Sequence, residues 1–116
     1  MPRRKRHPTL PDGPLVLVAA RFRALGDPSR LKIVNRLMNG EQAVQELLEE
    51  TGLTQTNLSR HLGILRQQGI VERRSEGNRA LYRIADPTIV DVCEAVCGSL
   101  ADQLAEDLDE FQGSGI

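Results

Sequence analysis

Apolar residues recur every three or four positions through most of this chain, which is the period of an α-helix with one buried face. The pattern predicts five helices, over residues 14–25, 28–39, 44–51, 54–68 and 87–111. Asp27–Pro28 and Asp86–Pro87 each combine a capping carboxylate with a proline that suits the first helical position. A glycine follows each of the first four helices and indicates where it ends.

The three central helices have clear apolar stripes that we expect to form the core. These stripes comprise Leu31, Val34, Leu37 and Met38, then Val44, Leu47 and Leu48, then Leu58, Leu62 and Leu65. The first helix is apolar nearly all round, which in so small a protein indicates a second face buried against a partner chain.

One stretch, from Ile70 to Ile84, has the composition of strands rather than a helix. Two apolar and arginine-bearing segments flank Gly77 and Asn78, which tolerate the positive φ of a tight turn. The short "TGLT" segment at residues 51–54 joins the predicted helices over residues 44–51 and 54–68, as the turn of a helix-turn-helix does. The order of elements therefore predicts a mainly α winged helix-turn-helix with a two-stranded β-wing.

Composition suggests how the chain is divided. Residues 1–13 hold three prolines and the basic run "RRKR", so we expect a basic, disordered arm. A single domain over residues 14–111 and a flexible tail over residues 112–116 would follow. No run of eighteen apolar residues or secretory signal is present, and we expect a cytoplasmic protein.

Charge is segregated along the chain, although the net charge is only −1. Residues 1–83 contain all fifteen Lys and Arg with eight acids, a net charge of +7. Residues 84–116 contain the other eight acids and no Lys or Arg. A basic body of this size favours a polyanionic partner over a chance imbalance of solvated faces.

Candidate DNA contacts follow from these elements. The outer face of the helix from Thr54 to Gln68 has residue types that bind base edges and phosphates, and no carboxylate occurs between Thr54 and Val71. The N-terminal end of such a helix usually enters the major groove. The predicted contacts are Gln55, Thr56, Ser59, Arg60 and His61 on the helix, and Arg73, Arg74 and Arg79 on the wing.

The segments "ALGDPSRLKIVNRL" and "TQTNLSRHLGILRQQGIVERRSEGNRALYRI" resemble the ArsR/SmtB family of small bacterial repressors, over roughly residues 15–108. The resemblance implies a homodimer formed by the first and last helices, bound to a palindromic operator. It also implies repression that a metal ion or another small inducer relieves. The expected interface residues are Leu15, Val18, Phe22, Val96, Leu100, Leu104 and Leu108.

The metal sites known in this family are not reproduced here. Ala43 and Gln45 stand where the resemblance would place the thiolate ligands before the recognition helix. Thr88 and Ser99 replace both histidines of the zinc site on the last helix. The remaining aspartates are hard oxygen ligands that suit zinc poorly, so we predict no zinc site and no required cofactor.

Both cysteines lie in "DVCEAVC" on the last helix, with Cys93 and Cys97 on one face one turn apart. They could sense a thiophilic metal, arsenite, an oxidant or reactive sulfur, and so release the operator. Alternatively, both are small apolar residues that pack a core, and the inducing signal is unknown. The acids Asp91 and Glu94 nearby do not favour a reactive thiolate.

Two other classes of function compete with a repressor. A winged helix can serve as a protein-interaction module, which the carboxylate-free helix face disfavours. A thiol enzyme is disfavoured because no CxxC spacing or neighbouring histidine accompanies the cysteines. We therefore expect no catalytic activity, with double-stranded DNA and a second copy of the chain as partners.

Overall fold

The computed structural model describes residues 8–114, with side chains described for residues 8–109. Its elements are α1 (Asp12–Leu25), α2 (Pro28–Leu37), β1 (Gln42–Ala43), α3 (Val44–Thr51), α4 (Gln55–Gln67), β2 (Val71–Glu76), β3 (Arg79–Ile84) and α5 (Pro87–Ser114). This is the predicted winged helix-turn-helix. Within the described residues, no helix is long and apolar enough to cross a membrane.

The hydrophobic core lies where α2, α3, α4 and the base of the wing meet. Ile33, Leu47, Leu65 and Ile70 are fully buried, and Leu58 is only 1% exposed. All three residues predicted for the stripe of α4 are buried, as expected. Leu31 is a correction, since its side chain is 43% exposed while Ile33 takes the buried position on α2.

The caps confirm the local predictions for most helices. The Asp27 carboxylate accepts a hydrogen bond from the Arg30 N–H at 3.0 Å, and the Thr54 hydroxyl accepts one from the Asn57 N–H at 3.2 Å. Gly52 ends α3 with a φ of 70°, a conformation that favours glycine. These caps set where α2 and α4 begin and where α3 ends.

Three helix boundaries differ from the sequence prediction by two or more residues: the start of α1, the end of α2, which comes at Leu37 rather than at residue 39, and the end of α5. Helix α1 begins at Asp12 rather than at residue 14, because Pro11 serves as its N-cap and the first-turn N–H groups need no intrahelical partner. Helix α5 continues to Ser114, past the predicted end at 111. Residues 1–7 of the predicted arm and residues 115–116 of the predicted tail lie outside the described residues.

The wing belongs to a three-stranded antiparallel sheet with the order β1-β3-β2. Val71 pairs with Ile84 and Glu76 pairs with Arg79, so a two-residue turn of Gly77 and Asn78 closes the hairpin. Gly77 has a φ of 61°, as the turn requires. The short strand β1, which pairs with Tyr82 and Leu81, was not predicted.

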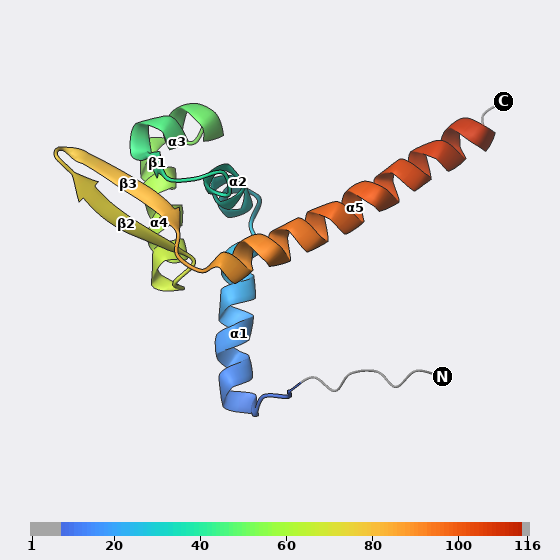
Figure 1. The fold of residues 1–116 in the computed structure, drawn as a ribbon, viewed down its shortest axis with the longest axis horizontal. Coiled ribbons are helices and arrows are strands. Elements are labelled where there is room, and N and C mark those ends of the chain that lie inside the picture. The colour runs from blue at the N-terminus through green and yellow to red at the C-terminus, as the bar shows by residue number, and fades with distance from the viewer. Residues whose placement is uncertain (1–7, 115–116) are drawn as a thin grey trace.

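Helices α1 and α5 extend away from this body in different directions, and α5 is the longest element, with 28 residues (Figure 1). Only the start of α5 packs against the core, through Ile89 and Cys93. Most of its length therefore stands free of the rest of the chain.

Candidate nucleic-acid interface

The N-terminal half of α4 presents an exposed polar face. Gln55, Thr56, Ser59 and Arg60 are all exposed, as the sequence predicts. The positive end of the helix dipole lies at the same place, beside the capping Thr54. This end of α4 therefore combines side chains of types that can hydrogen-bond to base edges with a weak attraction for phosphate.

The tip of the wing lies close to this end of α4. Gln55, Asn78 and Arg79 line one hollow of about 250 Å³, together with residues at the start of α3. Residues from α4 and from the hairpin turn thus form one continuous surface. The structure thus brings together two of the predicted contacts, Gln55 on the helix and Arg79 on the wing.

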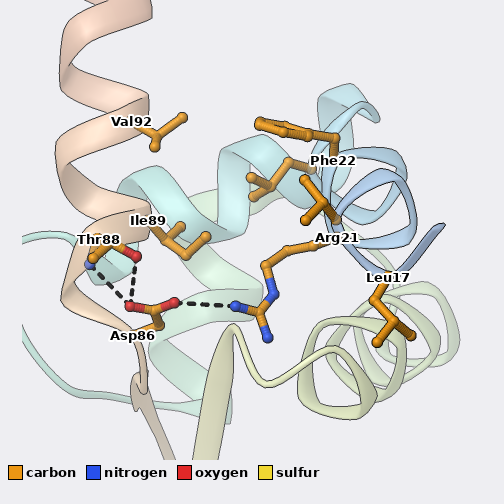
Figure 2. A pocket seen from close by; sticks show the side chains of 9 residues that line it. Leu17, Arg21, Phe22, Asp86, Thr88, Ile89 and Val92 are labelled. Atoms are coloured by element: carbon orange, nitrogen blue, oxygen red, sulfur yellow. Dashed lines mark hydrogen bonds and ion pairs between the residues drawn. The ribbon is translucent and has the colours of Figure 1, made fainter. Parts of the chain in front are cut away.

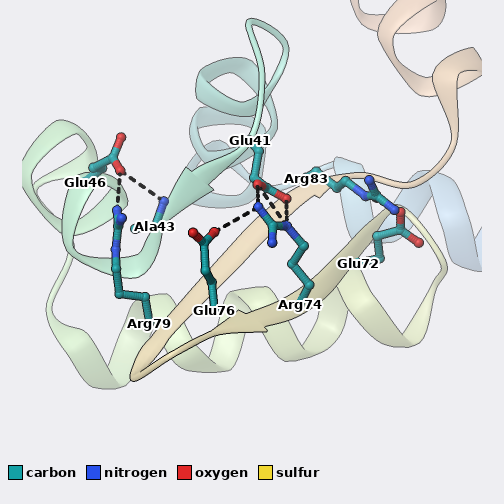
Figure 3. Close-up of polar contacts among 8 residues, drawn as sticks. All are labelled: Glu41, Ala43, Glu46, Glu72, Arg74, Glu76, Arg79 and Arg83. Carbon is teal, nitrogen blue, oxygen red and sulfur yellow. Dashed lines mark hydrogen bonds and ion pairs between the residues drawn. The ribbon is translucent and has the colours of Figure 1, made fainter.

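The wing arginines are exposed, but most are paired with carboxylates in the free chain (Figure 3). Arg74 donates from Nε to Oε2 of Glu41 at 2.8 Å and from Nη2 to Oε1 at 2.7 Å, and it also pairs with Glu76 at 3.1 Å. Arg79 pairs with Glu46 at 3.2 Å, and Arg83 pairs with Glu72. Most of the wing arginines are therefore charge-compensated in the free chain, and their role as DNA contacts stays a prediction.

The ion pair between Glu41 and Arg74 shifts the pKa values of both groups. The Arg74 guanidinium lowers the pKa of the Glu41 carboxyl, and Glu41 raises the pKa of Arg74 in return. Arg73 differs, because its Nη1 donates to the Ser75 hydroxyl at 3.2 Å and no ion pair involves it among the described residues. Arg73 is thus the wing arginine whose charge is least compensated.

His61 does not lie on the outer face, and its assignment as a DNA contact is wrong for this structure. Its side chain is 6% exposed and lies with Leu58, Leu62 and Leu65 on the buried side of α4. Its Nδ1 lies 3.3 Å from Nη1 of Arg30. Helical periodicity explains the position, because residue 61 is three and four residues from the buried positions 58 and 65.

The comparisons with known proteins agree with this geometry. A model of the bacterial regulatory proteins of the arsR family matches residues 27–73, from the cap of α2 to the start of β2. An uncharacterized HTH-type transcriptional regulator of Mycobacterium tuberculosis is 37% identical over 91 residues, which is 78% of this chain and 80% of that protein. The chain belongs to the ArsR family.

Solved structures support the same assignment. The homodimeric winged helix-turn-helix DNA-binding domain of a Mycobacterium bovis regulator matches with a TM-score of 0.71 and 36% identity, covering 82% of this chain and 87% of that one. The transcriptional repressor BigR of Xylella fastidiosa matches with a TM-score of 0.68 and 34% identity, covering 73% of this chain and 87% of that one. The family match over residues 27–73 includes the whole of α4.

In this ArsR-family chain, the residues predicted for a dimer interface are exposed on α1 and α5. They are Leu15, Val18, Phe22, Val96, Leu100, Leu104 and Leu108, each between 38% and 62% exposed. Between α1 and the start of α5 lies a hollow of about 360 Å³ with mostly apolar walls (Figure 2). The ion pair between Arg21 and Asp86, at 3.2 Å, crosses this hollow.

Asp86 caps the N-terminal end of α5. Its Oδ1 accepts hydrogen bonds from the Thr88 hydroxyl at 2.6 Å and from the Thr88 N–H at 3.0 Å, and these bonds lower the pKa of the carboxyl. No group of three or more potential metal ligands occurs within the described residues. Asp86 thus has a structural role at the start of α5.

The two cysteines have different surroundings although they lie one turn apart. Cys93 is 8% exposed and belongs to the hydrophobic core, whereas Cys97 is exposed. Burial raises the pKa of the Cys93 thiol, and the neighbouring Cys97 adds to the effect. Cys93 therefore packs into the core, while Cys97 adjoins the exposed apolar stripe of α5.

Three residues of the site were missed by sequence reasoning: Arg30, Glu41 and Glu46. Glu41 and Glu46 each pair with an arginine 33 residues away. Arg30 contacts His61, which is 31 residues away. No local pattern could have indicated these pairs.

Proposed function

We propose that this protein is a homodimeric, sequence-specific DNA-binding repressor of transcription that an inducing signal releases from its operator. The observation that supports it best is the exposed, carboxylate-free N-terminal half of α4 beside the tip of the wing. Gln55 and Arg60 there can form paired hydrogen bonds with base edges. The repressor names of related ArsR-family proteins agree with this role.

A palindromic operator follows from two copies related by a two-fold axis. Each copy would place one α4 in the major groove, with the two half-sites separated by about one helical turn, roughly 34 Å. The exposed apolar faces of α1 and α5 supply the surface that a second copy would cover.

The test is duplex binding measured by fluorescence anisotropy, on an operator selected from a random-sequence DNA pool. Gln55→Ala is expected to cost about 1–3 kcal/mol on the operator and little on random duplex, because a base contact carries the specificity. Gln67→Ala is the matched control, since Gln67 is equally exposed but lies in the last turn of α4.

Equal losses on the operator and on random duplex for Gln55→Ala would contradict a base-reading role. Salt-independent binding, or none, would instead favour a protein-interaction module, because contacts with phosphates release counterions.

We propose further that Cys93 and Cys97 receive the signal by coordinating a thiophilic ion. With arsenite, the two thiols would displace two hydroxyl groups of As(OH)₃ as water and form two As–S bonds. The boundary position of the pair supports this role, because one thiol lies in the core and the other lies beside the exposed stripe of α5. Both thiols lie on α5, so binding one ion with both would pull Cys93 out of its packing and shift α5 against the core, with a coupling of about 1–3 kcal/mol.

Arsenite is expected to release the wild-type protein from its operator and to leave the double variant Cys93→Ala/Cys97→Ala bound. The variant should bind the operator normally without arsenite. Equal release of both proteins would exclude the cysteines as the sensor, and they would then serve only to pack α5.

A further inference from the structure

Arg30 occupies the junction of three helices. Its backbone N–H completes the cap of α2, while its side chain reaches the C-terminal end of α1. Nε donates to the Ala24 carbonyl oxygen at 2.6 Å, and Nη2 donates to the Arg23 carbonyl oxygen at 3.3 Å. Nη1 lies 3.3 Å from Nδ1 of His61 on α4. A single guanidinium therefore connects α1 to α4.

This contact constrains the protonation state of His61. A guanidinium has donors and no acceptor, so Nδ1 of His61 must accept the bond and Nε2 must hold the ring proton. A second proton on the ring would have to go to Nδ1, directly opposite Arg30. The contact thus exists only while the imidazole is neutral.

The surroundings of His61 oppose the extra charge. Burial is the largest effect that lowers the pKa of His61, and the Arg60 and Arg30 guanidinium groups lower it further, while Asp27 acts in the opposite direction. Asp27 and Arg30 face His61 from α2, and Arg60 precedes it on α4. Helix α1 contributes two backbone carbonyl oxygens, those of Arg23 and Ala24, and both accept hydrogen bonds from Arg30. The segment that joins α4 to β2 contacts the C-terminal end of α4, where the Ile70 N–H donates to the Leu65 carbonyl oxygen.

We propose that Arg30 and neutral His61 are positioning residues for α4, and that protonation of His61 lowers the affinity for the operator. The inference rests on the proposed function and adds a regulatory feature to it. In the free chain, α4 can shift slightly to separate a protonated His61 from Arg30. DNA in the groove would oppose that shift, so the bound state takes up the proton less readily and acid weakens binding.

The sign of the pH dependence separates this role from a direct contact. A histidine on the DNA face would gain a phosphate partner on protonation, and affinity would rise as the pH falls. The buried geometry of His61 gives the opposite sign. The predicted surface role and the observed buried position therefore lead to contrary results in one experiment.

The experiment measures operator affinity by fluorescence anisotropy from about pH 8 to about pH 5.5, a range in which histidine is the side chain that ordinarily titrates. Wild-type affinity for the selected operator is expected to fall as the pH drops, by at most about tenfold per pH unit for each linked proton, and so by at most about a hundredfold for the two His61 residues of a dimer. His61→Asn offers an amide oxygen that can accept from Arg30 but cannot be protonated in this range, so its affinity, compared with its own value at pH 8, should lose most of the pH dependence. His7→Asn, which removes the chain's other histidine, is the control and should retain it.

Folding must be followed in parallel. The unfolded chain takes up this proton first, because the pKa of His61 is lowered in the folded state from its ordinary value of 6.5. Folding stability therefore falls as the pH drops below that value, and circular dichroism must show a folded protein at each pH. Nitrogen NMR of the ring is a second readout, and Nδ1 should be unprotonated and accept a hydrogen bond at pH 8.

Affinity that rises on acidification, or a wild-type pH profile that His61→Asn leaves unchanged, would overturn this inference alone. A proton on Nδ1 at pH 8 would overturn it as well. Failure of the wild type to select any duplex at pH 8 would overturn the proposed function, and the positioning role with it.

Discussion

Replacing Leu104 by alanine should weaken the dimer without disturbing the fold of the chain. Leu104 is 60% exposed in the middle of the free part of α5, between Leu100 and Leu108 on the same stripe. It is not part of the hydrophobic core, and alanine is the best helix former. The variant therefore removes surface that a second copy could cover and leaves the rest intact.

The size of the effect follows from the exposed fraction. Leu→Ala deletes three carbon groups, worth about 2.4 kcal/mol when fully buried at ~0.8 kcal/mol each. The exposed 60% of the side chain corresponds to about 1.4 kcal/mol of burial still available to a partner. A symmetric dimer buries the residue twice, so dimerisation should weaken by about 3 kcal/mol, or roughly a hundredfold in Kd.

Sedimentation equilibrium over a range of protein concentrations measures this Kd directly. The matched control is Leu31→Ala, because Leu31 is also exposed but lies on α2, outside the expected interface. Circular dichroism should show equal helix content for both variants. The operator affinity of Leu104→Ala should fall together with dimerisation, since each copy supplies one α4.

Two outcomes would refute this reasoning. The stripe on α5 would not be the interface if Leu104→Ala and Leu31→Ala changed the dimer Kd equally. A wild-type chain that sediments as a monomer at micromolar concentrations would exclude the homodimer itself.

The remaining predictions concern the wing and share one measurement, the slope of operator affinity against salt concentration. Arg73→Ala should reduce that slope by about 0.9 for each phosphate that Arg73 binds, because Arg73 has no carboxylate partner among the described residues to displace. Glu41→Gln should strengthen binding and steepen the slope, because it removes one of the two carboxylates that pair with Arg74 and so makes its guanidinium more available to a phosphate. An unchanged slope in either variant would contradict the corresponding assignment.

Much of the fold could be predicted because the signals are local. Asp27, Thr54 and the glycine after α3 act within a few residues of their own position, and each sets a helix end where expected. The strand β1 could not be predicted, because its two residues gain their structure from pairing with β3, about 40 residues away.

The orientation of a helix was harder to predict than its existence. Leu31 and Ile33 lie at opposite edges of the apolar stripe of α2, so the pattern allows either residue at the edge of the buried face. The structure buries Ile33 and exposes Leu31. Packing against the neighbouring helices makes that choice, and the sequence of α2 does not contain it.

His61 shows how residue type can mislead at a site that was otherwise predicted well. Its neighbours Ser59 and Arg60 are exposed as expected, and a polar residue beside them suggests the same face. The spacing from Leu58 and Leu65 indicates the opposite face, and spacing was the better guide. A buried imidazole needs a polar partner, and Arg30 supplies it from a different helix.

The net charge of the wing depends on carboxylates that pair with its arginines although they lie far away in the sequence. Glu41 and Arg74 are 33 residues apart, yet their two short hydrogen bonds hold the wing to the loop before β1. In the proposed complex, a phosphate must replace this carboxylate before Arg74 can contribute, and the same holds for Arg79 with Glu46. Such an exchange makes the gain per arginine smaller than a free cation would give. Binding energy then depends more on the exposed face of α4, where the bases are read, and discrimination between the operator and other DNA improves.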